Sequence, residues 1–308
     1  MSERIMDIRW IEDFLSVASS RSFSRAAEER HISQPSLSRH IQALEHWVGV
    51  PLIERRGLPL TLTPEGVLFR DNAEHFLRRL LETRSMLRGE VNPDAHSLRV
   101  IAGHSLSVNF VPSWLQTVRQ DYSDISVRAV TASINKAIKA LSDGSADLLL
   151  CYHHTELPVL LDETRYAFLP LGDTVLLPVS APGLDGRPRY ALPGTRQVPV
   201  PLISFATGAY LRRAVQYLLD HAGQPYALLR RYESDMSDQA KELVLQGLGM
   251  AWLPEMVVSQ ELAEGRLVRA GGQRWQLPLG IRLYCDLNNR KPALVRLWQH
   301  LSGRDLPD

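Results

Sequence analysis

The spacing of hydrophobic residues changes once along this chain, near residue 90. Before that point apolar side chains recur at helical intervals, and Trp10, Phe14 and Ala18 would lie on one face of a first helix. Beyond it, short apolar runs alternate with amphipathic stretches, which predicts strands followed by helices. The sequence therefore predicts an all-α N-terminal part and an α/β C-terminal part.

Two short helices joined by a tight turn are expected after the first one. Ser22 or Ser24 can cap the second helix, and its Ala26–Ala27 pair would let another helix cross closely. Ser33 can cap the third helix, which Gly49 would end. The apolar face of the third helix consists of Leu37, Ile41, Leu44 and Val48.

An extended segment and a long helix are expected to follow. Gly57 and Pro59 are turn residues within residues 51–62, so this segment fits a two-stranded wing. Thr63 would cap the long helix. A long helix with one apolar stripe and no neighbour in its own domain usually pairs with another chain, so we expect dimerisation here. The stripe consists of Val67, Leu68, Asn72, Phe76, Leu80 and Leu87.

The polar face of the third helix carries side chains that can read DNA. Arginine can bond guanine, glutamine can bond adenine, and hydroxyls can bind phosphates or either base. In a helix-turn-helix, the start of the second helix of the motif enters the major groove. Taken alone, the pattern also fits a small helical bundle with a solvated polar face. The candidate DNA-binding residues are Ser33, Gln34, Pro35, Ser36, Ser38 and Arg39 on the helix, and Arg55 and Arg56 in the wing.

Residues 89–94 form a hinge by composition, and beyond it we expect an open α/β sheet with helices on both faces. This half of the chain is long enough for two subdomains. Its strands are predicted at 98–102, 125–130, 147–152, 173–179, 199–204, 226–233, 249–253 and 279–286. Its helices are predicted from 105, through 137–141, and at 209–221, 236–246 and 292–301.

Composition limits the class of protein. The 308 residues, 44% of them hydrophobic, can bury the cores of two or three globular domains. The formal net charge of +1 argues neither for nor against DNA binding, because a DNA reader needs only a local basic surface. Two cysteines, Cys151 and Cys285, are too few for a disulfide framework. With no signal sequence and no apolar run of membrane length, the protein is expected in the cytoplasm.

Several motifs, in order, resemble those of the LysR-type transcriptional regulators. They are Phe23-Ser24-Arg25-Ala26-Ala27, residues 32–45, Leu62-Thr63-Pro64-Glu65-Gly66 and, in the second half, residues 247–254. One departure is Leu58-Pro59-Leu60 after the turn glycine, where wings of this family often carry basic residues. The departure leaves the wing's phosphate contacts to Arg55 and Arg56.

The resemblance implies a fold class and a set of partners. The fold would be an all-α winged helix-turn-helix with a long linker helix, then an α/β effector domain of two Rossmann-like subdomains similar to periplasmic binding proteins. The partners would be double-stranded promoter DNA, a small-molecule effector or an oxidant, RNA polymerase, and further copies in a homodimer or homotetramer. The implied boundaries are 1–63 for the DNA-binding domain, 64–90 for the linker helix, 91–97 for the hinge and 98–308 for the effector domain. Subdomain I would span about 98–170 and 275–308, and subdomain II about 171–274.

The ends of the predicted strands carry candidate effector-binding residues. Ligands of open α/β sheets bind beyond the carboxyl ends of strands, often at helix N-termini. Each hydroxyl there could equally be an ordinary helix cap. The family resemblance implies an effector contact at Ser105. The full candidate set is His104, Ser105, Ser133, Ser204, Phe205, Thr207 and Met236.

A narrower resemblance concerns oxidant sensing. Residues 104–107, 111–113, 234–237 and 243–255 are similar to the hypochlorite-responsive subgroup of the family, in which methionine oxidation is implicated in sensing. Oxidation converts an apolar thioether into a polar sulfoxide, which would change packing at Met236. Met236 fits a role in the core equally well.

Two other classes of function are compatible with parts of the sequence. A solute-binding or transport protein with a helical appendage is the main alternative, and the ordered N-terminal motifs oppose it. The sequence has no nucleophile elbow, phosphate-binding loop or paired carboxylates that would favour an enzyme. His104, His153 and His154 lack the spacing of a zinc site, and no metal or other cofactor is expected. The sequence thus predicts a DNA-binding regulator.

Overall fold

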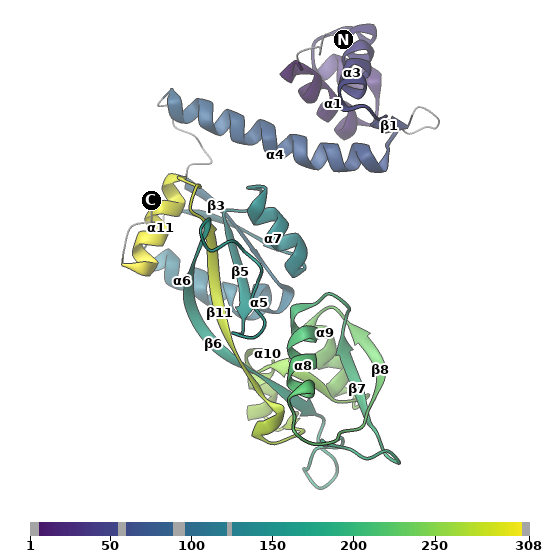
Figure 1. Cartoon of the computed structure of the whole chain (residues 1–308), viewed down its shortest axis with the longest axis vertical. Helices are drawn as coiled ribbons and strands as arrows, with labels where there is room; N and C mark the ends of the chain where they lie inside the picture. The colour runs from purple at the N-terminus through teal and green to yellow at the C-terminus, as the bar shows by residue number, and fades with distance from the viewer. Residues whose placement is uncertain (1–5, 55–59, 89–95, 122–124, 304–308) are drawn as a thin grey trace. The chain divides into compact units, whose positions relative to one another are not determined.

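The computed structural model describes residues 6–54, 60–88, 96–121 and 125–303 (Figure 1). The chain forms two compact units, one up to Asn92 and one from Pro93, and each is described by itself. Within the described ranges, no helix is both long and apolar enough to cross a membrane. The predicted fold class, a helix-turn-helix followed by an α/β domain, is confirmed.

Three short helices build the core of the first unit. Ser22 is the cap of the second, because its Oγ accepts a hydrogen bond from the amide of Arg25 (3.4 Å). Ser33 caps the third in the same way, and Gly49, with a φ of 88°, ends it. The helices are α1 (Ile8–Ser20), α2 (Phe23–Glu29) and α3 (Gln34–Val48).

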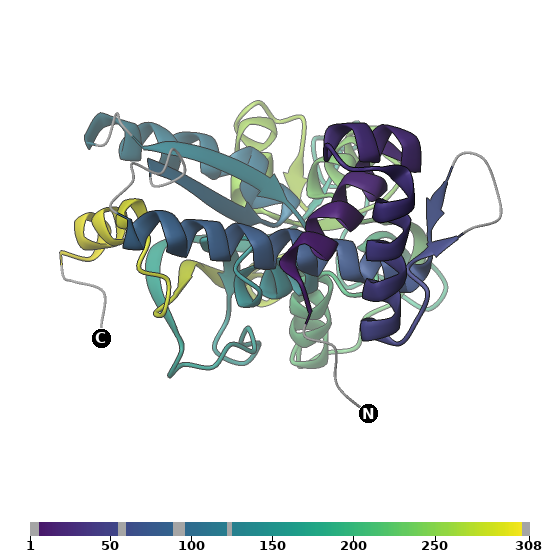
Figure 2. The ribbon, with the colours of Figure 1, turned by 90° about the horizontal axis from the view of Figure 1, so that it is seen from above.

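A short wing follows the helices, as predicted. Strands β1 (Ile53–Glu54) and β2 (Thr61–Leu62) pair antiparallel, and Figure 2 shows them beside the three helices. The Oγ1 of Thr63 then accepts a hydrogen bond from the amide of Gly66 (2.9 Å), which caps the next helix. The wing tip, with Arg55, Arg56 and the turn residues 57–59, lies outside the described residues.

One side of the long helix α4 (Pro64–Leu87) packs against the three short helices. Phe69 contacts Phe14 of α1 edge to face, with ring centroids 5.3 Å apart. Farther along the helix, Phe76, Leu80 and Leu81 are 49%, 43% and 53% exposed. The apolar stripe predicted from the sequence therefore faces solvent in a single chain.

The second unit is built on a mixed seven-stranded sheet of order β10-β6-β11-β5-β3-β4, in which β10 is Val268–Arg269 and β9 (Ala251–Pro254) is paired to β6. Three parallel strands belong to a first lobe: β3 (Ser97–Ala102), β4 (Ser126–Thr131) and β5 (Leu148–His153). Two long antiparallel strands, β6 (Tyr166–Ser180) and β11 (Leu277–Asp286), continue from this lobe into a second one (Figure 1). The two lobes thus share one sheet.

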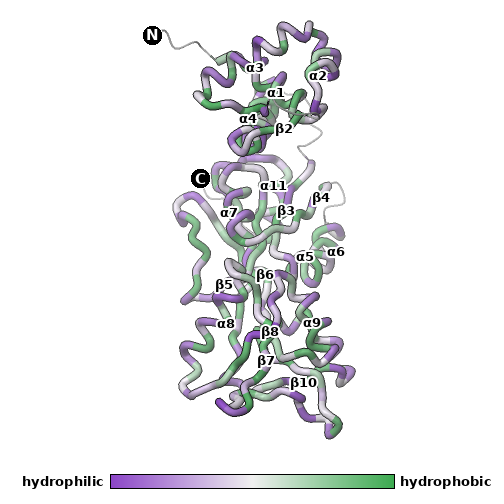
Figure 3. Tube along the Cα trace, turned by 90° about the vertical axis from the view of Figure 1, so that its right-hand side faces the viewer, coloured by the Kyte–Doolittle hydropathy of each residue, from purple (hydrophilic) through white to green (hydrophobic). Residues whose placement is uncertain are grey.

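Helices cover both faces of the first lobe. The chain crosses from β3 to β4 and then returns past β3 to β5, and right-handed crossovers in opposite directions place their helices on opposite faces. Figure 3 shows α7 on one side of the sheet and α5 and α6 on the other. The helices of this lobe are α5 (His104–Asn109), α6 (Val111–Asp121), α7 (Ile134–Ser142) and α11 (Pro292–Ser302).

The second lobe repeats this layering around the parallel pair β7 and β8, with α8 and α9 on opposite faces (Figure 3). Its strands are β7 (Val200–Phe205), β8 (Leu228–Ser234), β9 (Ala251–Pro254) and β10 (Val268–Arg269). Its helices are α8 (Tyr210–Asp220), α9 (Ser237–Leu245), α10 (Glu255–Ala263) and the short 3-10 helix Gln273–Trp275.

Three of the differences between the predicted and the observed elements have a clear physical cause. One helix was expected from residue 105, but the chain breaks at Phe110 and α6 starts afresh with Pro112 in its first turn, where proline is favoured. Helix α10 was missed, because the acid Glu261 is buried beside Val257 and Val258 and interrupts the apolar pattern of the inner face. Strand β6 begins at Tyr166 rather than 173, since it extends through both lobes.

Candidate DNA-binding surface and effector cleft

The candidate DNA-binding residues of α3 lie together at its exposed start. Hydrogen bonds order them: Ser24 Oγ donates to Gln34 Oε1 (3.3 Å), Ser33 Oγ donates to Ser36 Oγ (3.0 Å), and Arg39 Nη2 donates to Ser36 Oγ (3.3 Å). Ser33, Gln34, Pro35 and Arg39 are exposed, and Ser36 and Ser38 are half-buried. The structure therefore brings all six α3 candidates to one surface.

Charge on this surface favours a polyanion. Residues 34–42 contain no acidic side chain. The one acid farther along α3, Glu45, is turned to the wing, where its Oε1 accepts hydrogen bonds from the amides of Leu52 (2.9 Å) and Ile53 (3.2 Å). Nothing on the start of α3 would therefore repel DNA phosphates, although the unit as a whole is not basic.

A cavity of about 420 Å³ opens between the two lobes of the second unit. Ligand pockets usually measure about 300–1,000 Å³, so a small molecule fits. One wall consists of the ends of β3, β4 and β5 with the starts of α5 and α7, and the other of residues 205–211 and 235–237. We call this cavity the cleft.

Six of the seven candidate effector-binding residues line the cleft, namely His104, Ser105, Ser133, Phe205, Thr207 and Met236. The assignment of Ser204 to the cleft is wrong. Alternation along β7 turns Phe205 to the cleft, while Ser204 faces away and donates to the carbonyl of Tyr232 (3.3 Å).

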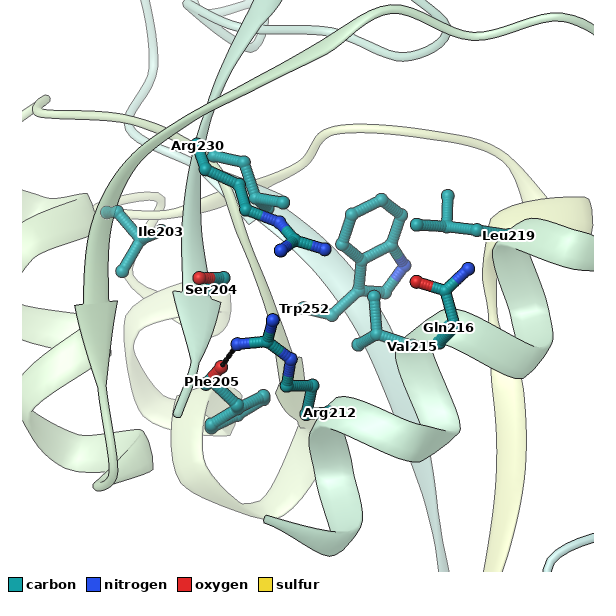
Figure 4. A pocket seen from close by; sticks show the side chains of 10 residues that line it. Ile203, Ser204, Phe205, Arg212, Val215, Gln216, Leu219, Arg230 and Trp252 are labelled. Atoms are coloured by element: carbon teal, nitrogen blue, oxygen red, sulfur yellow. Dashed lines mark hydrogen bonds between the residues drawn. The ribbon is translucent and has the colours of Figure 1, made fainter. Parts of the chain in front are cut away.

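Ser204 instead lines a separate pocket on the outer side of β7, shown in Figure 4 with Arg212, Arg230 and the Trp252 ring. Arg212 Nη1 donates there to the carbonyl of Phe205 (2.8 Å) and pairs with Glu233. The free volume is about 30 Å³, close to the share of one water molecule. This pocket is too small for an effector.

Four helices begin at the cleft with no side-chain cap. Ser133 stands at the N-cap of α7 and Met236 at that of α9, and neither side chain accepts a capping bond. The first amides of each helix therefore lack intrahelical partners, and the positive end of each helix dipole points towards the cavity. The Ser133 hydroxyl, which an ordinary cap would engage, stays available to a ligand.

A buried hydroxyl pair forms the floor of the cleft. Ser105 Oγ lies 2.9 Å from Tyr152 OH, and each residue is 5% exposed. Burial raises the pKa of Tyr152, so its proton stays on at neutral pH. Burial also raises the pKa of the neighbouring Cys151 to about 12, which keeps it a poorly reactive thiol. Tyr152 was missed because it ends an uninterrupted apolar strand.

The two walls also meet through a histidine and an aspartate, a contact that the sequence did not indicate. His104 Nδ1 at the start of α5 lies 3.4 Å from Asp238 Oδ2 in the first turn of α9. The pair is ionic only when the imidazole is protonated. Among the described residues, no cluster of three or more His, Cys, Asp and Glu side chains could hold a metal ion.

The contact between the Ser105 and Tyr152 hydroxyls should contribute measurably to the free energy of unfolding. Tyr152→Phe leaves the buried Ser105 hydroxyl without its partner, and we expect the free energy of unfolding to fall by about 1 kcal/mol. The measurement is denaturant unfolding followed by far-ultraviolet circular dichroism. Tyr226→Phe, at a ring that is 39% exposed, is the matched control. Equal stability of the two variants would contradict a structural role for the pair.

Comparison with known proteins covers both units. The model of the bacterial regulatory helix-turn-helix protein, lysR family, matches residues 8–67. The model of the LysR substrate binding domain matches residues 92–305. Since the second model alone covers more than half of the chain, the family is shown, and the solute-binding alternative is not supported.

Named relatives and solved structures match this chain along nearly its whole length. The HTH-type transcriptional regulator YjiE of Escherichia coli K12 is 29% identical over 297 residues, covering 96% of this chain and 94% of its own. Vibrio fischeri DarR, solved in complex with DNA, is 30% identical over 98% of this chain and 100% of its own, with a TM-score of 0.60.

HypT from Salmonella typhimurium, described as a hypochlorite-specific LysR-type regulator, is 29% identical over 97% of this chain and 98% of its own, with a TM-score of 0.60. Its regulatory domain has also been solved with bromide bound, at 25% identity over 70% of this chain and 98% of its own and a TM-score of 0.59. The chain belongs to the LysR family of DNA-binding transcription regulators and carries an effector-binding domain in its second unit.

Proposed function

We propose that this regulator binds double-stranded promoter DNA through the start of α3, acting in the cytoplasm where the chromosome lies. The observation that carries this proposal is the gathering of Gln34, Ser36 and Arg39 on one exposed, acid-free helix end. These side chains can bond base edges in the major groove, and the helix-turn-helix presents that end to the groove. The solved DNA complex of DarR supports the same use of the first unit.

Arg39 gives the sharpest test of DNA reading. Arg39→Ala removes a side chain able to bond guanine, which is worth about 1–3 kcal/mol, so we expect binding to weaken roughly tenfold or more. The measurement is an electrophoretic shift with DNA from upstream of the protein's own gene, at one fixed salt concentration. Arg196→Ala, an exposed arginine in the second unit, controls for the lost charge. Equal affinities of the two variants would contradict the role of Arg39.

We propose that the exposed side of α4 forms the dimer interface of a homodimer or homotetramer. Its apolar side chains Phe76, Leu80 and Leu81 are about half exposed in one chain, and an apolar stripe on a long helix buries itself best against a second copy. A two-fold dimer would also present two copies of α3 to paired half-sites.

Leu80→Asp tests this assignment, because a carboxylate in the seam would stand in an apolar contact. We expect the variant to sediment as a smaller species than the wild type. Leu160→Asp, at a leucine that is 84% exposed on the second unit, is the matched control and should sediment like the wild type. Unchanged assembly of Leu80→Asp would place the interface elsewhere.

The effector that sets activity is, in this proposal, a small anion in the cleft. Uncapped amides of four helices and the hydroxyls of Thr131, Ser133 and Thr207 line the cavity, and all of them can donate to an anion. One acidic residue, Asp235, is exposed at the lining. Bromide in the regulatory domain of HypT supports an anion in this kind of domain.

A second candidate signal is an oxidant such as hypochlorite. Met236 lines the cleft, is only half-buried and stands at the start of α9, where a sulfoxide would place a polar group in the wall. The similarity to HypT along nearly the whole chain supports this candidate.

Met236→Ile tests the oxidant signal, since isoleucine keeps an apolar side chain but cannot form a sulfoxide. We expect hypochlorite to change the DNA affinity of the wild type and to leave that of Met236→Ile unchanged. Met256→Ile, at a half-buried methionine of α10, is the matched control and should respond like the wild type. An equal change of DNA affinity on hypochlorite treatment in all three proteins would contradict a sensing role for Met236.

A further inference from the structure

One buried carboxylate joins all three helices of the helix-turn-helix. Asp13 of α1 is 2% exposed. Its Oδ1 accepts a hydrogen bond from Arg30 Nε (2.7 Å), and its Oδ2 lies 2.6 Å from His40 Nδ1. Because a carboxylate accepts, the imidazole Nδ1–H donates to it. Arg30 ends α2 and His40 lies within α3, so the three helices meet at one acid.

The arrangement is specific because each oxygen has its own donor. Arg30 uses its Nη2 for a second pair, with Glu12, the residue before Asp13 on α1. The side chains of Arg30 and His40 are 31% and 32% exposed, so Asp13 is the only member of the trio that is fully enclosed. A buried carboxylate costs several kcal/mol unless its partners are in place, which disfavours other arrangements of these helices.

Apolar packing alone leaves freedom that this network removes. The stripe of Leu37, Ile41 and Leu44 is buried, but hydrophobic contact is non-directional and tolerates small rotations and shifts of a helix. A hydrogen bond weakens steeply as its angle departs from linear. His40 follows Arg39 directly and stands one turn after Ser36, so its bond to Asp13 constrains the part of α3 that carries the DNA-facing side chains.

We propose that Asp13, through Arg30 and His40, is a positioning residue that sets the rotation and depth of α3 and thereby its discrimination between DNA sequences. The proposal rests on DNA binding by α3. None of the three side chains needs to touch a base. The sequence carries one sign of this buried carboxylate. Asp13 lies next to Phe14 on the buried face of α1, where an apolar residue is expected from the helical period.

The test compares discrimination, because a merely structural role would not change it in folded protein. The full-length protein is measured against DNA from upstream of its own gene and against an unrelated duplex of equal length, at one salt concentration. Phosphate contacts supply most non-specific affinity, whereas base-edge contacts need accurate placement. We expect Asp13→Asn to weaken specific binding about tenfold or more and non-specific binding less than about twofold.

Asp7→Asn is the matched control, since Asp7 caps the same helix from a half-buried position and asparagine caps equally well. It changes the charge of the unit by the same amount and should keep the wild-type ratio of specific to non-specific affinity. Circular dichroism establishes that each variant is folded at the temperature of the binding assay.

A second variant keeps the proposal testable if Asp13→Asn unfolds. Replacing the trio together, as Asp13→Leu, Arg30→Met and His40→Leu, removes the buried charge with its partners, a change that proteins often tolerate. We expect a folded protein with reduced discrimination. A folded variant of either kind with the wild-type ratio would overturn the proposal. A wild type that itself shows no discrimination would contradict the proposed function instead.

Discussion

The DNA-binding surface depends on the burial of one stripe of α3. Leu37, Ile41 and Leu44 are fully buried, and each such side chain contributes about 1.5–3 kcal/mol on leaving water. The hydrogen bonds among the exposed polar residues of the helix are solvated and contribute far less. Packing therefore decides which way the helix faces, and the polar residues at its start are left free to suit a particular DNA sequence.

A comparable constraint shapes the second unit. Strand β11 pairs along its whole length with the part of β6 from Tyr166 to Leu176, and both strands belong to both lobes, with a register shift between Ile281 and Arg282. The strand ends of the two lobes therefore face one cavity, and the helices that follow those strands start there. Polar groups of the cleft come from backbone amides at helix starts as much as from side chains, which suits binding of a small polar ligand.

Much of the fold could be predicted from the sequence, because caps and periodicity act locally. The cap at Ser33, the end of α3 at Gly49 and most strands of the second unit follow from such signals. Helix α10 could not be predicted, since the acid Glu261 lies on its buried side and blurs the apolar face that marks an amphipathic helix.

The site was partly predictable for the same reason. The ends of the predicted strands indicate where a cleft lies, and six of the seven candidate residues line it. Ser204 lies outside the cleft because alternate residues of β7 point to opposite sides of the strand. Contacts between residues far apart in sequence, such as Asp13 with His40 and Ser105 with Tyr152, leave no periodic trace. These pairs appear only once the helices and strands are packed.

Footprinting of the full-length protein on the DNA upstream of its own gene tests the central claim most directly, because it asks for sequence-specific binding by a symmetric assembly. The account predicts two protected half-sites whose centres lie about one helical turn of 10 base pairs, or a multiple of it, apart on the duplex. Absence of any protection at low salt, with folded protein at concentrations that saturate non-specific binding, would contradict it.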